Sequence, residues 1–202
     1  MILVILMCLT AAVIELDNVS AGQFGIGRPF VCGALFGFLM GYPSAGVQLG
    51  IFLELLFLDF TPVGGVLPPN GTVAALCAVM AACYGAPLYF AFFYGAAVGL
   101  GFRFVEMRIR GAAGKRLLAR QQNLINNPMR TINAFIFGSM FVQVVTTFAV
   151  MLAAVLAAKT FLYYAKPAAP GIHTAFSAAY MAVPWLGIFT LLRKFNYKVN
   201  AK

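Results

Sequence analysis

The stretch GIFLELLFLDFTPVGGVLPPNG, residues 50–71, combines an apolar run, two carboxylates and a corner that breaks the backbone. Glu54 and Asp59 stand among apolar side chains, where an ionised carboxylate in a membrane costs roughly 2.5–3.5 kcal/mol. The run ends at a Pro-Pro-Asn-Gly corner, which a helix cannot continue through. Acids beside an interrupted backbone in apolar sequence indicate that these groups have polar partners there.

The composition of the whole chain agrees with a membrane environment. Of 202 residues, 62% are hydrophobic and 9% are charged, whereas soluble domains carry roughly 25% charged residues. No charged residue occurs in 29–53, 60–102, 131–158 or 167–192, and each run reaches the roughly 20 residues that cross a hydrocarbon core. The opening MILVILMCLTAAVI lacks the basic start of a signal peptide, so we interpret it as a retained membrane segment. The sequence predicts an all-α polytopic membrane protein with a single membrane-embedded domain over residues 1–202.

The net charge of +9 is concentrated in two short segments. Seven of the fourteen basic residues lie in 103–130 and four more lie in 193–202. Such clusters beside membrane spans mark the cytoplasmic side, which argues against a nucleic-acid partner. We therefore expect a basic cytoplasmic loop at 103–130, a helical hairpin at 131–192 with its turn outside, and a basic cytoplasmic tail at 193–202. Leucines at helical spacing in the loop suit a helix at the bilayer interface or, equally, a docking surface for a cytosolic partner.

Residues 1–102 are expected to contain discontinuous or re-entrant helices. Gly33, Gly37 and Gly41 recur at a spacing of four, as do Gly46 and Gly50, and such stripes allow close helix packing. The GYPSAG corner divides this region into fragments at 29–41 and 46–59, each too short to cross alone. Residues 72–102 fit either one long span or a hairpin folded at YGAPLY. Non-helical backbone at membrane depth needs cover from protein or water, and broken helices are typical of transport sites.

Glu54 is the acid deepest in apolar sequence and has two interpretations. It is either a packing or capping carboxylate, or a polar group that lines a substrate cavity. Asn70, at the tip of the Pro-Pro corner, either satisfies that turn or contacts substrate, whereas Asp59 is placed near a helix end. The cysteines lack metal-ligand spacing, no G-x-x-x-x-G-K-[ST] phosphate loop is present, and the only histidine, His173, falls on the expected outer side. We therefore expect no catalytic residue, metal or cofactor in this chain.

The segments GQFGIGRPFVCGALFGFLMG and GVQLGIFLELLFLDFTPVGGVLPPNGTVAA make the chain similar to a known family. They resemble the membrane-spanning IIC component of the mannose/fructose/sorbose-type sugar phosphotransferase system, and the likeness is dense over 13–80 and weaker over 165–195. The residues that match the family pattern are Asp17, Gln23, Arg28, Pro29, Glu54, Gly64, Gly65, Pro68, Pro69 and Asn70.

The resemblance implies a sugar permease subunit in the bacterial inner membrane. It implies a hetero-oligomer with a IID membrane subunit and with cytosolic IIB and IIA phosphocarriers, which carry out the phosphoryl transfer. It makes Asp17, Gln23, Glu54 and Asn70 candidate sugar contacts. Tyr42 stands at the position where the family usually has the Asp of a Leu-Gly-Asp motif. Because of this departure, the alternative function is a non-transporting membrane scaffold that recruits phosphotransferase proteins.

Overall fold

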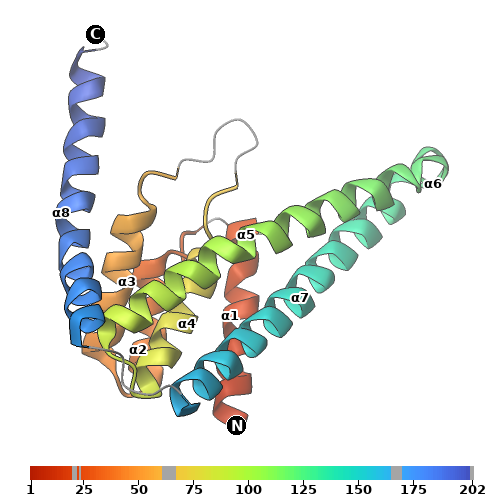
Figure 1. Ribbon diagram of the computed structural model, residues 1–202. Coiled ribbons are helices and arrows are strands. Elements are labelled where there is room, and N and C mark those ends of the chain that lie inside the picture. Colours follow the sequence, from red (N-terminus) through yellow and green to blue (C-terminus); the bar gives the residue numbers. More distant parts are fainter. Residues whose placement is uncertain (20–21, 23, 61–66, 165–169, 201–202) are drawn as a thin grey trace.

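The computed structural model describes residues 1–19, 22, 24–60, 67–164 and 170–200, and every regular element among them is an α-helix. The prediction of an all-α membrane protein is confirmed (Figure 1). The helices are α1 (Ile2–Val19), α2 (Pro29–Leu39), α3 (Pro43–Phe57), α4 (Gly71–Cys83), α5 (Leu88–Leu118), α6 (Gln121–Asn126), α7 (Pro128–Tyr164) and α8 (Pro170–Asn200).

Helices α2 and α3 are the two fragments that the GYPSAG corner was expected to separate. Pro29 and Pro43 occupy first-turn positions, where a proline lacks only an N–H that would have no intrahelical partner. Between them Gly41 adopts φ +77°, a left-handed conformation that glycine adopts without steric cost. The chain thus reverses within three residues, and α2 and α3 pack side by side in antiparallel orientation.

Helix α4 is the centre of the fold, because the residues from Gly71 to Met80 are all buried. It packs on α5 through a hairpin whose turn contains Gly85, with φ +89°, and Pro87. Of the two alternatives for residues 72–102, the structure therefore has the hairpin at YGAPLY. Around α4 the core continues into an aromatic group in which Phe52 of α3 meets Tyr180 of α8 at a centroid distance of 4.7 Å.

Residues 103–130, expected as a basic cytoplasmic connection that includes an interfacial helix, are mostly helical in the structure. Helix α5 runs on to Leu118, α6 follows, and α7 begins at Pro128, so these residues form a helical arm that projects from the core (Figure 1). The physical reason is that 18 of these 28 residues are Ala, Arg, Leu, Lys, Gln, Met or Glu, which all have high helix propensity. The structure thus has helices on both sides of the short α6 in this segment.

The two helices of the hairpin expected at 131–192 correspond to α7 and α8, which pack against different helices of the core. Helix α7 packs along α1 and α4, while α8 packs along α3, so the two helices lie on separate sides of the core (Figure 1). Helix α6 connects α5 to α7, but α5 packs mainly on α4 and α7 mainly on α1. The two helices separate because each buries its own face, Met151 and Val155 on α7 and Tyr180 and Val183 on α8.

Three of the described helices are long and apolar enough to cross a bilayer, namely Leu88–Leu118, Pro128–Tyr164 and Gly171–Phe195. Large apolar side chains are exposed along α7 and α8, including Phe137, Phe141, Trp185 and Phe189. A soluble protein rarely exposes so much contiguous apolar surface. These faces suit lipid or another membrane subunit.

Candidate functional site

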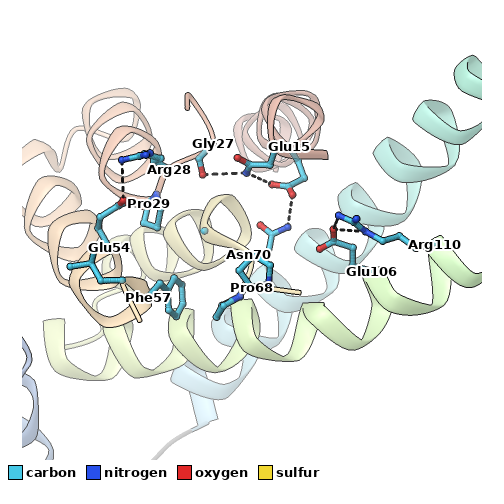
Figure 2. Close-up of a pocket in the computed structure, with 14 residues that line it drawn as sticks. Glu15, Gly27, Arg28, Pro29, Glu54, Phe57, Pro68, Asn70, Glu106 and Arg110 are labelled. Atoms are coloured by element: carbon cyan, nitrogen blue, oxygen red, sulfur yellow. Dashed lines mark hydrogen bonds and ion pairs between the residues drawn. The ribbon is translucent and has the colours of Figure 1, made fainter. Parts of the chain in front are cut away.

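A polar cavity of about 250 Å³ lies where the short helices meet the middle of α5 (Figure 2). It is formed by the end of α1, the start of α2, the end of α3, the Pro-Pro corner and one face of α5. Its charged and amide side chains are those of Glu15, Asn18, Arg28, Glu54, Asn70, Glu106 and Arg110. Pro29, Phe57, Leu58, Pro68 and Pro69 add apolar surface.

Asn70 and Glu15 form the most buried part of this site. Asn70 caps α4, because its Oδ1 accepts a hydrogen bond of 2.9 Å from the backbone N–H of Val73. Its Nδ2 donates to Oε1 of Glu15 at 2.6 Å, and Glu15 is only 1% exposed. Asn70 therefore satisfies the backbone at the start of α4 and also lines the cavity.

Asn18 extends this contact to the first turns of α2 and α4. Its Nδ2 lies 3.1 Å from Oε2 of Glu15 and 3.2 Å from Oγ1 of Thr72, and Thr72 in turn donates to the Gly27 carbonyl at 3.1 Å. A Cβ added at Gly27 would lie 2.2 Å from Asn18 Nδ2. A larger residue at position 27 would therefore displace the Asn18 side chain from its contacts with Glu15 and Thr72.

Glu54 lies on the opposite wall and is held more loosely (Figure 2). Its Oε1 is 3.8 Å from Nη1 of Arg28, and its Oε2 is 3.4 Å from the backbone N–H of Phe30 in the first turn of α2. Both distances exceed those of good hydrogen bonds. Because the Glu54 side chain is 27% exposed, it retains acceptor capacity directed at the cavity.

A second acid–arginine pair comes from α5. Oε1 of Glu106 accepts hydrogen bonds from Nε and Nη2 of Arg110, at 3.1 and 2.6 Å. Glu106 is buried, whereas the Arg110 guanidinium is about half exposed. On the side of the cavity formed by α5, the negative charge of Glu106 is therefore neutralised by the positive charge of Arg110.

The sequence-predicted site residues are only partly brought together. Glu54 and Asn70 both line this cavity, but Asp17 does not. The Asp17 carboxylate instead accepts hydrogen bonds from the backbone N–H groups of Phe24 and Ile26, at 2.8 and 2.9 Å. Asp17 thus shapes the turn before α2. Gln23 lies outside the described residues. His173 lies elsewhere, with its Nδ1 against the Tyr89 hydroxyl.

Sequence reasoning did not select Glu15, Asn18, Glu106 or Arg110 as site residues. An acid in apolar sequence was a usable signal for Glu15, while Glu106 lies within the segment 103–130, which stood out by its positive charge. The lining offers carboxylate and carbonyl acceptors together with amide and guanidinium donors, beside proline and phenylalanine surface. Such a set can recognise a small polyhydroxylated molecule by hydrogen bonds. Within the described ranges no three His, Cys, Asp or Glu residues are grouped to hold a metal ion.

Comparison with known proteins gives a family match over nearly the whole chain. A family model described as the sorbose-specific IIC component of the phosphotransferase system matches residues 1–199. No curated protein sequence matches significantly. A solved structure described only as a membrane protein superposes with a TM-score of 0.80 at 15% identity, covering 96% of this chain and 80% of the other. A cryo-EM structure of the mannose transporter ManYZ with microcin E492 superposes with a TM-score of 0.66 at 14% identity, covering 99% and 77%.

Proposed function

The chain belongs to the family of sorbose-specific IIC components of the phosphotransferase system, and on this premise we propose that it is the permease subunit of a phosphoenolpyruvate-dependent sugar phosphotransferase system. It binds a hexose or related sugar in the cavity and translocates it together with a IID-type subunit in the bacterial cell membrane. Cytosolic IIB and IIA phosphocarriers carry out the phosphoryl transfer.

The observation that carries this proposal is the composition of the cavity. An uncharged sugar is recognised through many hydroxyl groups, each able to donate and accept. Glu54 supplies an acceptor, Arg28 supplies donors, and the proline and phenylalanine surface suits the carbon face of a pyranose ring. Its volume of about 250 Å³ lies just under the roughly 300–1,000 Å³ of drug-sized ligand sites, which favours a monosaccharide over a larger ligand.

The short helices support translocation rather than fixed binding. Helices α2, α3 and α4 are each too short to span a bilayer, with 11, 15 and 13 residues, and the cavity lies at their ends. Sites at the ends of discontinuous helices are typical of secondary transporters. Movement of this group of helices relative to α7 and α8 would expose the cavity to alternate sides.

A IID-type partner is supported by the exposed apolar faces of α7 and α8. These faces extend over two helices, and a membrane subunit would cover part of them by packing while lipid covers the rest. Coexpression with a IID-type subunit is expected to yield a stable complex. Isolation of this chain alone as a monodisperse, sugar-binding species would contradict the partnership.

Uptake of radiolabelled sugars tests the function as a whole. A panel of hexoses and related sugars is offered to cells that express the chain with IID, IIB and IIA partners, and to matched cells that lack only this chain. We expect uptake of at least one sugar that requires the chain. If the complex assembles but no sugar enters or binds, the alternative of a membrane scaffold that recruits phosphotransferase proteins replaces transport.

A further inference from the structure

A second cavity, of about 420 Å³, lies at the arm tip. The arm consists of residues 103–130, and the arm tip is its segment 115–130. Arg120, Asn126, Asn127 and Arg130 line it, and they come from the α5–α6 turn, α6 and the beginning of α7. We propose that this cavity binds the phosphate of an anionic phospholipid headgroup and thereby anchors the arm tip at the membrane surface. The inference does not depend on the sugar specificity of the other cavity.

The charge at the tip has no compensating acid in this chain. The tip also carries Lys115 and Arg116, and no Asp or Glu occurs anywhere in 107–202. The acids of the chain have contacts elsewhere: Glu54 with Arg28, Glu106 with Arg110, and Asp59 with Arg193 and Lys194. Glu15 and Asp17 accept hydrogen bonds from Asn70 and from backbone N–H groups. An external anion is therefore the complementary charge for Arg120 and Arg130.

The sequence along α7 places this cavity at headgroup depth. Arg130 immediately precedes the uncharged run 131–158, which is about 42 Å long as a helix and so is long enough to cross a hydrocarbon core of roughly 30 Å when tilted. A cationic residue at the start of such a run lies at the boundary between lipid tails and water. The phosphates of phospholipids occupy that same level.

Apolar side chains at the tip favour a lipid over a phosphorylated protein as the source of the anion. Leu118, Ile125 and Met129 are 73%, 74% and 74% exposed, and all three lie within the arm tip. Basic residues interspersed with exposed apolar ones are typical of segments that insert into the interface of an anionic membrane. Figure 1 shows the tip projecting from the helical core, with α6 at its end.

The test uses full-length protein in neutral detergent micelles, with its partner subunit where it copurifies. Binding of fluorescent phosphatidylglycerol is measured by anisotropy, with phosphatidylcholine as the zwitterionic comparison. The test variant is Arg120→Gln with Arg130→Gln. The matched control, Arg108→Gln with Arg116→Gln, removes the same charge from exposed arm positions that do not line the cavity.

We expect phosphatidylglycerol to bind at least tenfold more tightly than phosphatidylcholine. The test variant should lose at least about thirtyfold in phosphatidylglycerol affinity, because it removes both arginines that line the cavity, and charge-assisted contacts of arginine with phosphate are among the strong hydrogen bonds. The control should change less than threefold. Thermal unfolding midpoints of the two variants should agree, which separates loss of the site from loss of the fold.

Three results would overturn the proposal. Equal losses in both double variants would mean that diffuse charge, not the cavity, attracts the lipid. Displacement of the lipid by inorganic phosphate at equal concentration would assign the cavity to free phosphate. Unchanged lipid binding in the test variant, combined with lost binding of a phosphorylated cytosolic partner, would assign the arm tip to protein docking.

Discussion

At the scale of single residues, two of the three cavity glutamates, Glu15 and Glu54, differ in how much of their hydrogen-bonding capacity the protein uses. Glu15 is almost fully buried and contacts Asn70 and Asn18 at 2.6 and 3.1 Å. Glu54 has only the long contacts to Arg28 and Phe30, at 3.8 and 3.4 Å. Glu15 therefore holds the helix ends together, while Glu54 remains available to a ligand.

The first prediction concerns Glu54. Glu54→Gln keeps the side-chain volume and removes the charge, and hydrogen bonds to charged groups contribute about 1.5–3 kcal/mol. Sugar affinity of the assembled complex, measured by calorimetry, should fall by about ten- to a hundredfold. Asp59→Asn is the matched control, because Asp59 follows the same helix outside the cavity lining. An equal loss in this control would remove Glu54 from the binding site.

The second prediction tests the contact between Glu15 and Asn70. Asn70→Asp keeps the acceptor that caps α4 but replaces the donor by an oxygen facing Glu15, where the donor now lies at 2.6 Å. The loss of a buried hydrogen bond should destabilise the protein by about 1–3 kcal/mol and lower its thermal unfolding midpoint. Adding Glu15→Gln restores a donor and should recover most of the loss. No recovery in the double variant would show that the two side chains are not partners.

At the scale of helices, the glycines of α2 and α3 bring two backbones into contact. A Cβ added at Gly33 would lie 2.6 Å from the Gly46 carbonyl oxygen, and one at Gly46 would lie 2.4 Å from that of Gly33. Both distances are too short for real side chains, so larger residues would separate the helices. Arg28 precedes α2 and Glu54 lies on α3, so this contact also sets the distance across the cavity wall.

The third prediction follows from this contact. Gly46→Ala should destabilise the protein by about 1–3 kcal/mol, the usual cost of overpacking, and should weaken sugar binding as well. Gly101→Ala is the control, since a Cβ at Gly101 meets nothing within 4 Å and alanine favours a helix more than glycine does. Thermal unfolding and sugar binding are measured on both variants. Comparable stability of the two would mean that α2 and α3 tolerate separation.

At the scale of the whole molecule, the two basic segments lie toward the same end. Figure 1 shows the arm tip and the C-terminal end of α8 on the side opposite the N-terminus of α1. The arm contains seven basic residues in 103–130, and the tail contains four in 193–202. Since Lys and Arg beside membrane spans stay in the cytoplasm, the shared end is the expected cytoplasmic end.

The fourth prediction is this orientation. Single cysteines are introduced at Arg116 and at Tyr164, both exposed, in a background without the four native cysteines. A membrane-impermeant thiol reagent should label position 164 but not 116 in intact cells, and both after permeabilisation. The opposite pattern in intact cells would invert the topology.

Several features of this protein are already determined by local sequence. The low charge and long apolar runs predict membrane helices, because the cost of burying charge in lipid depends on composition more than on packing. The break between α2 and α3 follows from Pro43 and Gly41, whose backbone preferences act within a few residues. Glu54 and Asn70 could be selected because an acid in apolar sequence and an asparagine beside two prolines are unusual locally.

Tertiary structure alone decided which residues share the cavity and how the long helices pair. Glu15 and Asn70 are 55 positions apart in the chain, and Glu106 joins the same cavity from α5. The local pattern did not distinguish Asp17, which binds backbone N–H groups, from Glu15, which reaches Asn70. Nor did it show that α7 packs along α1 and α4 rather than along α8. Spacing within one helix defines which residues share a face, but the partner of that face is chosen by shape and by hydrogen bonds between segments distant in the chain.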